Sequence, residues 1–297
     1  MTGGGPPVTG EPRRLFALAF DHRSSLRRDF LGLTAAPTAD DQARCRELKT
    51  VVFEGLVAGA YHVLAHGAEP AILVDQEYGA DVIAQAKDHR LTLIVPVEVS
   101  GQAELRFEHG DDGFGAAIER VDPSYVKALV RYDPLGDPDL NRRQRARLGR
   151  LQGWLDDHGR DWMLEVLVPG DFETTVAKAI DELVDAGLRP AYWKLEGQAS
   201  AAAYHTVAAA TQGIGHCLVL GRGADAAAVE RWLRLAAPVS DYRGFAVGRT
   251  LWWEPLRAFV HDPDVRDSRH RRAAVAAIAE NYRRLVDVYL EAADRAS

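Results

Sequence analysis

The chain has 297 residues, 47% of them hydrophobic, with a formal net charge of -7 at neutral pH and a sequence pI near 5.8. This length can bury a large core, either as one α/β barrel or as two smaller domains. Because the overall charge is acidic, the chain offers no general attraction to nucleic acid, and no nucleic-acid partner is expected.

The cysteines and the N-terminal residues indicate in which cellular compartment the chain is expected. Cys45 and Cys217 lie far apart without a CxxC spacing, so neither a disulfide scaffold nor a zinc knuckle is expected, and a reducing cytoplasmic location is the default. Residues 1–12 lack the pattern of a signal peptide and are expected to form a disordered tail before a single domain over 13–297. No apolar run is expected to cross a bilayer, so no membrane partner is expected.

Short apolar runs rich in β-branched and aromatic residues recur along the chain, each followed by a polar or glycine-containing stretch and a helical pattern. Helical patterns include residues 140–159, 173–187, 226–237 and 271–293. The predicted strands are residues 15–20, 71–75, 91–98, 125–132, 162–169, 191–196, 217–221 and 244–248.

Strands that alternate with helices imply parallel pairing through right-handed crossovers. Eight such units without a break in composition predict a closed (β/α)8 TIM barrel, of α/β class, in a single domain. An open doubly wound sheet is the alternative. It is less favoured because the chain has no GxGxxG or GxxxxGK[ST] nucleotide loop.

Ionisable residues stand at or just past the carboxyl end of every predicted strand, where a barrel collects its chemistry. Because unpaired buried charge is expensive, so many such residues indicate a functional site rather than chance. They are Asp21, Arg23, Glu77, Glu98, Lys127, Arg131, Glu165, Lys194, Glu196, Arg222 and Arg249.

Lys194 lies in the middle of AYWKLEGQ, an apolar and aromatic run that predicts a buried strand. The chain strongly prefers arginine, since only five of its 36 basic residues are lysines. Lysine, unlike arginine, can lose its proton on burial and form a Schiff base. A structural ion pair with a neighbouring glutamate is the alternative role.

The other strand lysine, Lys127, would favour the neutral amine of Lys194 by charge repulsion, although an ion-pair role is the stronger expectation for Lys127 itself. Glu165 and Glu98 are candidates for the proton shuttle of such chemistry. Asp21 could orient or deprotonate a substrate hydroxyl when a C–C bond breaks. Together these five residues are the predicted catalytic group.

Two glycine loops predict a phosphate site. Gly221-Arg222-Gly223 precedes a helix that begins near residue 225, and Gly248-Arg249 follows the eighth strand. Loops after the seventh and eighth strands hold phosphate in many barrels, because glycine lets backbone N–H groups approach the anion. A phosphorylated substrate is therefore expected, with Arg23, Glu77 and Arg131 as further binding candidates.

A metal site is less well supported, and no cofactor is expected. His62 and His66 fall inside a helical segment and lack the glutamate of an HExxH motif, so we expect them on a helix surface. The acidic and histidine side chains after the first two strands could still hold a divalent ion.

Longer motifs carry a resemblance over about residues 14–290. They are AFDHR, LVDQEYG, PVEVSGQ, FEHGDDGFGAAIERVDPSYVKALVRYDP, EVLVP, YWKLEGQ and GFAVGRTLWWEP. On these motifs the chain resembles class I, Schiff-base aldolases of the tagatose-bisphosphate aldolase type. It is most similar to the aldolase-like domain found C-terminal to 5-dehydro-2-deoxygluconokinase in inositol breakdown.

The resemblance implies that Lys194 forms the Schiff base and that Glu165, Lys127 and Asp21 occupy the family's catalytic positions, with Gly248 and Arg249 in the phosphate loop. It implies cleavage of a phosphorylated ketose or keto-acid, such as 2-deoxy-5-keto-gluconate 6-phosphate, to dihydroxyacetone phosphate and an aldehyde.

One departure from the family bears on the substrate. The family usually has a lysine after the glutamate of the third strand, where this chain has Val99. Aldolases for tagatose 1,6-bisphosphate or sulfofructose phosphate, a catalytically weak sugar-phosphate-binding regulator, and a barrel lyase or isomerase without a Schiff base therefore stay open. Pairing of barrels into a homo-oligomer also stays open.

Overall fold

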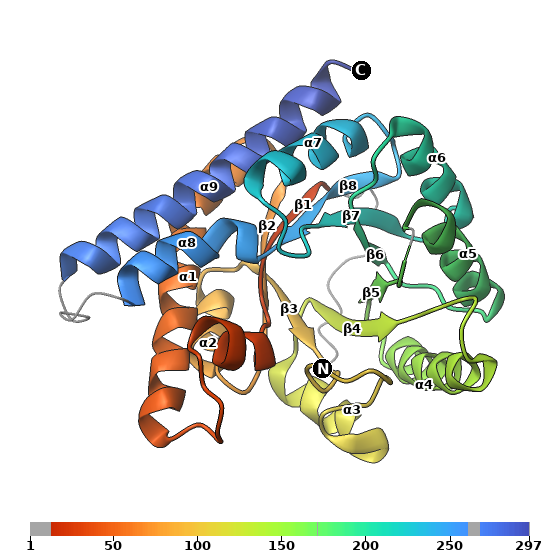
Figure 1. Ribbon diagram of the computed structural model, residues 1–297, viewed down its shortest axis with the longest axis horizontal. Helices are drawn as coiled ribbons and strands as arrows, with labels where there is room; N and C mark the ends of the chain where they lie inside the picture. Colours follow the sequence, from red (N-terminus) through yellow and green to blue (C-terminus); the bar gives the residue numbers. More distant parts are fainter. Residues whose placement is uncertain (1–12, 171, 261–267, 297) are drawn as a thin grey trace, which may run out of the picture.

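The computed structural model describes residues 13–170, 172–260 and 268–296, so the tail expected at residues 1–12 lies outside the described residues. The strands close into a (β/α)8 barrel in which each pairs in parallel with its neighbours in sequence, and β1 pairs with β8 (Figure 1). The predicted TIM barrel is confirmed. The strands are β1 (Leu15–Phe20), β2 (Glu69–Val74), β3 (Thr92–Pro96), β4 (Tyr125–Arg131), β5 (Trp162–Leu167), β6 (Tyr192–Glu196), β7 (His216–Leu220) and β8 (Tyr242–Val247).

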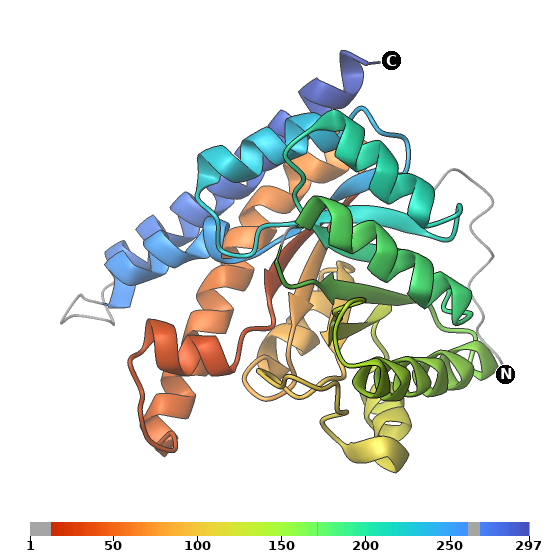
Figure 2. The same ribbon diagram turned by 45° about the vertical axis from the view of Figure 1, so that its right-hand side comes forward.

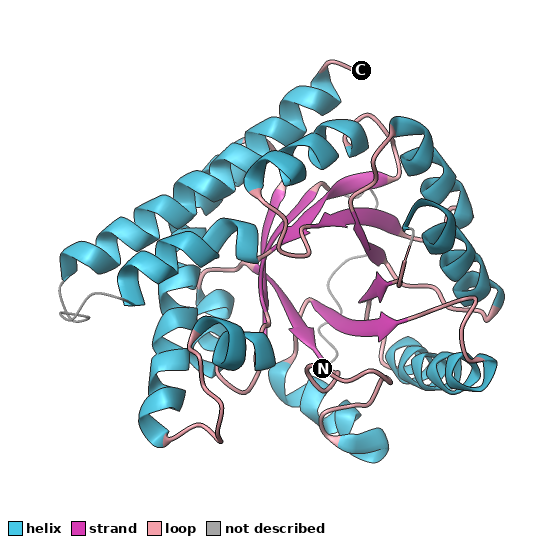
Figure 3. Ribbon diagram, viewed as in Figure 1, coloured by secondary structure: helices cyan, strands magenta, loops and turns pink. Residues whose placement is uncertain are grey.

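Helices surround the barrel as an outer ring (Figures 2 and 3). Several begin at side-chain caps that satisfy free backbone N–H groups, among them Thr38 in a capping box and Asp225, which accepts a bond from the N–H of Ala228. The helices are α1 (Ala39–Ala65), α2 (Ala80–Asp88), α3 (Gly110–Val121), α4 (Pro138–Asp157), α5 (Phe172–Asp185), α6 (Ala201–Ala210), α7 (Ala226–Ala236), α8 (Arg249–Val260) and α9 (Ser268–Asp294), with a short π-helix η1 (Leu26–Phe30) after β1.

Two apolar layers result from the alternation of side chains along the strands. Successive side chains along each strand point alternately outward, against the helices, and inward, where they fill the barrel interior. The interior cluster includes Ala17, Leu73, Ile94, Met163 and Tyr192. Continuing the same alternation toward the carboxyl ends places the strand lysines and glutamates on the inside, above this apolar layer.

Helix α1 bears on the expectation that no apolar run crosses a bilayer. By length and composition alone it could cross a membrane, with a mean hydropathy of 1.3 in its most apolar window. However, 56% of that window is buried inside the structure, because α1 packs between the strands and α9. Its apolar character is therefore explained by its packing between the strands and α9 in the outer ring of helices.

Helix α9 covers the seam where β1 meets β8 (Figure 1). The hydroxyl of Tyr282 donates to the carbonyl of Phe16 at 2.6 Å, and that of Tyr289 donates to the carbonyl of Tyr242 at 2.5 Å. One tyrosine thus binds the first strand and the other binds the last, which ties the ends of the sheet together.

The third strand is shorter than predicted. Residues 91–98 were expected as one strand, but β3 ends at Pro96 and residues 97–108 turn back as a hairpin over the barrel mouth. Its backbone bonds run from the N–H of Val99 to the carbonyl of Arg106 (2.9 Å) and from the N–H of Glu108 to the carbonyl of Val97 (2.8 Å). This hairpin carries Glu98 to the functional cavity.

Candidate active site

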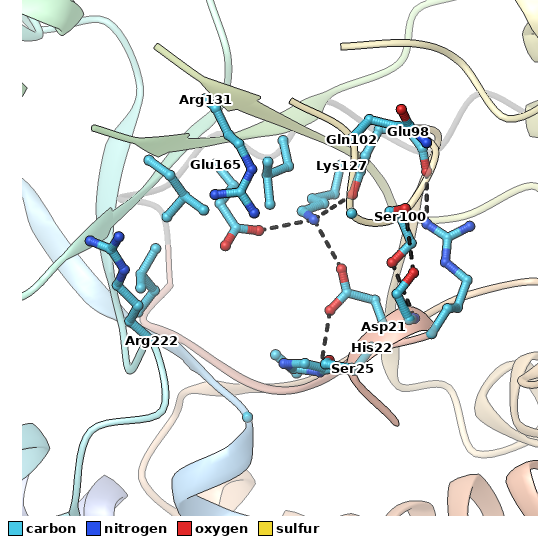
Figure 4. A pocket seen from close by; sticks show the side chains of 18 of the residues that line it. Asp21, His22, Ser25, Glu98, Ser100, Gln102, Lys127, Arg131, Glu165 and Arg222 are labelled. Atoms are coloured by element: carbon cyan, nitrogen blue, oxygen red, sulfur yellow. Dashed lines mark hydrogen bonds and ion pairs between the residues drawn. The ribbon is translucent and has the colours of Figure 1, made fainter. Parts of the chain in front are cut away.

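A cavity of about 330 Å³ opens at the carboxyl ends of the strands (Figure 4). This volume lies in the range of small-molecule sites. Residues from β1, β3, β4, β5, β6, β7 and β8 or their following loops line it. Among them are Asp21, Arg23, Glu98, Lys127, Arg131, Glu165, Lys194, Gly221, Arg222, Gly223, Gly248 and Arg249.

Lys127 lies at the centre of a carboxylate cluster (Figure 4). Its Nζ donates to Asp21 Oδ2 at 2.9 Å and to Glu98 Oε1 at 2.7 Å, and it lies 2.9 Å from Glu165 Oε2. Burial opposes the charge, but the three carboxylates outweigh it and hold the pKa of Lys127 well above its usual range. Lys127 is therefore a fixed cation, as its expected ion-pair role requires.

Glu165 joins the two strand lysines. Its Oε2 also accepts a hydrogen bond from Lys194 Nζ at 2.9 Å. Glu165 and Lys194 face each other directly in the register of β5 and β6, which explains why their inward side chains meet. The strand-five glutamate and strand-six lysine are thus brought together, as the sequence predicted.

The number of oxygen partners distinguishes the lysines of the cavity. An ammonium group has three N–H donors, and Lys127 has three carboxylate partners for them. Within the described part of the chain, Lys194 has the single partner Glu165, and its side chain, which is 6% exposed, lines the cavity. The amine of Lys194 can therefore be reached by a ligand, whereas that of Lys127 is fully engaged.

The three carboxylates differ in proton affinity. Burial raises the pKa of Glu98, even though Lys127 opposes this. Burial also acts to raise the pKa of Asp21 and of Glu165, but Lys127 and Lys194 outweigh it, so both values lie below the ordinary range. The site therefore combines two firmly ionised carboxylates with one that holds a proton more readily, an arrangement suited to proton transfer.

A second buried ion pair, absent from the predicted site, lies behind the cavity. Lys49 of α1 contacts Asp75 Oδ2 at 2.5 Å, and both side chains are 0% exposed. Lys49 Nζ also donates to the carbonyls of Phe20 and His22. These carbonyls flank Asp21, so Lys49 fixes the backbone that carries the Asp21 carboxylate into the cavity. The rarity of lysine in the chain was the available signal, because Lys49 interrupts an apolar helix.

His22 lies beside Asp21, with its Nδ1 3.9 Å from Asp21 Oδ1. Burial lowers the pKa of His22 to about 3, against the opposing effect of Asp21. The imidazole is therefore neutral near pH 7. It packs edge-on against Trp252, whose indole N–H donates to the carbonyl of Ala19.

Arg23 was predicted to bind substrate, but its guanidinium is engaged elsewhere. It donates to Glu108 Oε2 at 2.6 Å and to the carbonyl of Glu98 at 2.7 Å, and the side chain is 3% exposed. Ser24 adds two long contacts of 3.4 Å to Ser100. Arg23 thus lines the cavity and also clamps the 97–108 hairpin onto the loop after β1, and its role in substrate binding stays a prediction.

Glu77, also predicted to bind substrate, does not line the cavity. The carboxylate of Asp75 accepts a bond from the N–H of Tyr78 at 2.8 Å, and this turn sends Glu77 outward to an ion pair with Arg27 at 3.6 Å. Glu77 is therefore removed from the candidate site. Arg131, in contrast, lines the cavity, and its guanidinium has no hydrogen-bond or ion-pair partner among the described residues.

The two glycine loops meet at one edge of the cavity. The backbone of Gly223 has a φ of +84°, which favours glycine, and a Cβ added there would lie 2.7 Å from Cζ of Arg249 and displace this guanidinium. Arg249 Nη2 donates to the carbonyl of Arg222 at 2.7 Å. Two guanidinium groups and a backbone loop thus gather on the β7–β8 side, where the sequence predicts an anion site.

Metal-ligating side chains do not cluster in the described residues, which contain no group of three or more His, Cys, Asp or Glu side chains arranged to hold an ion. His62 binds Asp287 of α9 at 2.5 Å and lies on the helix surface, as expected. Cys45 and Cys217 are free and buried.

A family model described as "Uncharacterized protein conserved in bacteria (DUF2090)" matches residues 8–293. The chain belongs to this family. Among curated proteins, tagatose 1,6-diphosphate aldolase 2 from Streptococcus mutans is 30% identical over 155 residues, which cover 51% of this chain and 44% of that protein. The chain therefore matches less than half of that relative's length.

Solved structures share the fold of this family member. A fructose-bisphosphate aldolase from Plasmodium falciparum has a TM-score of 0.65 at 12% identity, covering 92% of this chain and 90% of its own. An archaeal fructose-1,6-bisphosphate aldolase, whose catalytic lysine is covalently bound to a carbinolamine intermediate, has a TM-score of 0.58 at 15% identity, covering 93% and 94%. At such identities the likeness establishes the barrel fold.

Proposed function

We propose that the protein is a class I aldolase, a lyase that cleaves a phosphorylated ketose or keto-acid to dihydroxyacetone phosphate and an aldehyde through a Schiff base on Lys194. The observation that carries this proposal is the contrast in the cavity between a fully paired lysine, Lys127, and an open lysine, Lys194, whose partner is the general acid–base candidate Glu165.

The first half of the reaction forms the imine. Glu165 accepts a proton from the ammonium of Lys194, and the neutral amine adds to the ketone carbon to give a carbinolamine. Loss of water then needs a proton on the leaving hydroxyl. Glu165, now protonated, or Glu98, whose pKa is raised by burial, can supply it. Lys127 stays cationic throughout and keeps the carboxylates together.

The second half breaks the C–C bond. Asp21 is kept ionised by Lys127 and can take the proton of the substrate hydroxyl, so that the aldehyde leaves and the bonding electrons pass to the imine as an enamine. Reprotonation of the enamine carbon and hydrolysis of the imine release the ketone and restore Lys194. Lys49 supports this step by fixing the backbone on both sides of Asp21.

The substrate class is inferred from the arginines of the cavity. Gly221, Arg222, Gly223, Gly248 and Arg249 form the proposed phosphate site on the β7–β8 side. Arg131 on β4 lies across the barrel from β8, and its guanidinium, which has no ion-pair partner in the described part of the chain, suits a second anionic group at the aldehyde end.

Among substrates with two anionic groups, we propose 2-deoxy-5-keto-gluconate 6-phosphate first, on the sequence resemblance. Tagatose 1,6-bisphosphate and sulfofructose phosphate are the alternatives. Val99, which lines the cavity where the family usually has a lysine, favours a different binding mode or a catalytically weak sugar-phosphate-binding regulator. A cytoplasmic location is proposed with the free, buried cysteines as support.

Covalent trapping tests the proposal. The wild-type protein and Lys194→Arg are incubated with dihydroxyacetone phosphate and borohydride in the presence of EDTA, and intact mass is measured. Lys178→Arg, at an exposed lysine of α5, is the matched control. A stable adduct on wild type and on Lys178→Arg, but not on Lys194→Arg, is expected. No adduct on any of the three rejects Schiff-base chemistry with this ketone.

A further inference from the structure

Glu196, the last residue of β6, has no part in the proposed lysine chemistry although it lies two residues beyond Lys194. Its carboxylate forms an ion pair with the guanidinium of Arg222, in the loop after β7. The side chain of Glu196 is 7% exposed, whereas that of Arg222 is 52% exposed. A buried acid on the nucleophile's strand thus holds a half-exposed cation at the cavity wall.

Arg222 belongs to the proposed anion site. It lines the cavity between two glycines, and its carbonyl accepts a bond from Arg249 at 2.7 Å. Its backbone is left-handed, with a φ of +46°. Such a conformation costs roughly 1 kcal/mol or more for a residue other than glycine, and is commonly retained at ligand sites. A backbone held in this way presents the Arg222 side chain at the rim of the cavity (Figure 4).

The surroundings of the Glu196 carboxylate make its protonation state sensitive to Arg222. Burial raises the pKa of Glu196 to about 7, while Arg222 opposes the rise and Glu165 from β5 adds to it; Arg131 from β4 is a weaker opposing charge. Gln198 donates to the backbone carbonyl of Glu196 and leaves the carboxylate to Arg222. Glu196 therefore depends mainly on the half-exposed Arg222 for its ionisation.

We propose that Glu196 competes with the anionic group of the substrate for Arg222, so that anion binding is coupled to uptake of a proton by Glu196. This deepens the proposed function and rests on it for the location of the anion site. When an anion draws Arg222 into the cavity, the buried carboxylate loses its cation and gains affinity for a proton. By linkage, a protonated Glu196 releases Arg222 and strengthens anion binding by the same factor.

The sign of the pH dependence follows from this competition. Below about pH 7 Glu196 holds a proton in the free protein and Arg222 is available, so the anion binds tightly. Above this pH each bound anion must bring a proton with it. The dissociation constant then rises by up to about tenfold per pH unit, the limit for one coupled proton.

Sulfate is the appropriate probe, because its charge is constant between pH 5.5 and 8.5 and it cannot form an imine. Its binding is measured by titration calorimetry in Tris and in imidazole, two buffers that are not anions. Wild type is compared with Glu196→Gln, Arg222→Gln and the surface control Glu280→Gln, which is outside the cavity. Folding of each variant is checked by thermal melting at each pH.

We expect sulfate binding by wild type and Glu280→Gln to weaken about tenfold as the pH rises through the neutral range, with uptake of up to one proton. Glu196→Gln should bind with the tight, low-pH affinity at every pH and take up no proton, and Arg222→Gln should bind weakly at every pH. A flat profile in wild type, a retained slope in Glu196→Gln, or no sulfate binding overturns the proposal. The trapping experiment on Lys194 reports on aldolase chemistry independently of these outcomes.

Discussion

Lys49 and Lys194 are both buried lysines of this barrel, but their surroundings differ in one decisive respect. Lys49, behind the cavity, gives its three donors to two carbonyls and a buried carboxylate. Lys194, at the cavity floor, has one carboxylate partner among the described residues and an open side toward the cavity. Burial alone therefore does not distinguish these two lysines; the number of N–H donors left open toward the cavity does.

Lys127 shows that buried lysines also differ in their number of partners within the cavity itself. It is as deeply buried as Lys49 and has three carboxylate partners. Because a buried ion pair is costly to break from one side, Lys49 and Lys127 should matter for stability. Lys194 should matter for chemistry, since residues poised for function are seldom optimised for stability.

The largest effect is expected for Lys194→Met on chemistry. Without the amine no enamine forms, and exchange of the carbon-bound proton of dihydroxyacetone phosphate with D2O should fall on the order of 10⁴-fold or more, as expected when a nucleophile is removed. The free energy of unfolding should change by less than about 1 kcal/mol, because Glu165 keeps its pairing with Lys127. NMR follows the exchange and urea unfolding the stability. Exchange at the wild-type rate would exclude Lys194 as the nucleophile.

Lys49→Met should give the largest loss of stability, about 3–5 kcal/mol, because it leaves the carboxylate of Asp75 buried without its cation. The double variant Lys49→Met/Asp75→Asn should recover a large part of this loss, since the uncompensated charge is removed. Lys87→Met, at an exposed lysine of α2, is the control and should stay within about 0.5 kcal/mol of wild type. Equal unfolding midpoints for Lys49→Met and Lys87→Met would contradict the pairing.

Lys127→Met should lower the free energy of unfolding by about 2–4 kcal/mol at pH 7.5, somewhat less than Lys49→Met. The carboxylate partners of Lys127 border the cavity and can take up protons or water. In wild type Lys127 holds the pKa of Asp21 below its unfolded value. In the variant the buried carboxyls should bind protons more tightly in the folded state than in the unfolded state, so the deficit should shrink as the pH falls from 7.5 toward 5. If the stability difference between wild type and Lys127→Met grew as the pH fell, groups other than these carboxyls would dominate the pH dependence of stability.

Much of this arrangement was visible in the sequence. The eight strands follow from apolar, β-branched runs, and the inward direction of Lys127, Glu165 and Lys194 follows from alternation along three of them. The rarity of lysine in an arginine-rich chain marked Lys194 as a candidate, and the structure places its amine beside Glu165.

The residues that sequence reasoning misplaced depend on contacts between distant segments. The ion pair between Arg23 and Glu108 was missed, because the folding of residues 97–108 over the barrel cannot be inferred from local pattern. Glu77 follows β2 directly, but a turn capped by Asp75 directs it away from the cavity. The Lys49 pair requires the docking of α1 against β1 and β2, which no local periodicity specifies.

The seam between β1 and β8 sets the order in which this protein can assemble. Leu15 of the first strand pairs with Gly244 of the last, and tyrosines of α9 bind both strands. During synthesis, β1 must therefore wait with one edge unpaired until nearly all of the barrel has left the ribosome. Sheets that depend on contacts so distant in sequence fold slowly and expose strand edges on the way. Protection of these edges in the growing chain is thus a cost of building the site on a closed barrel.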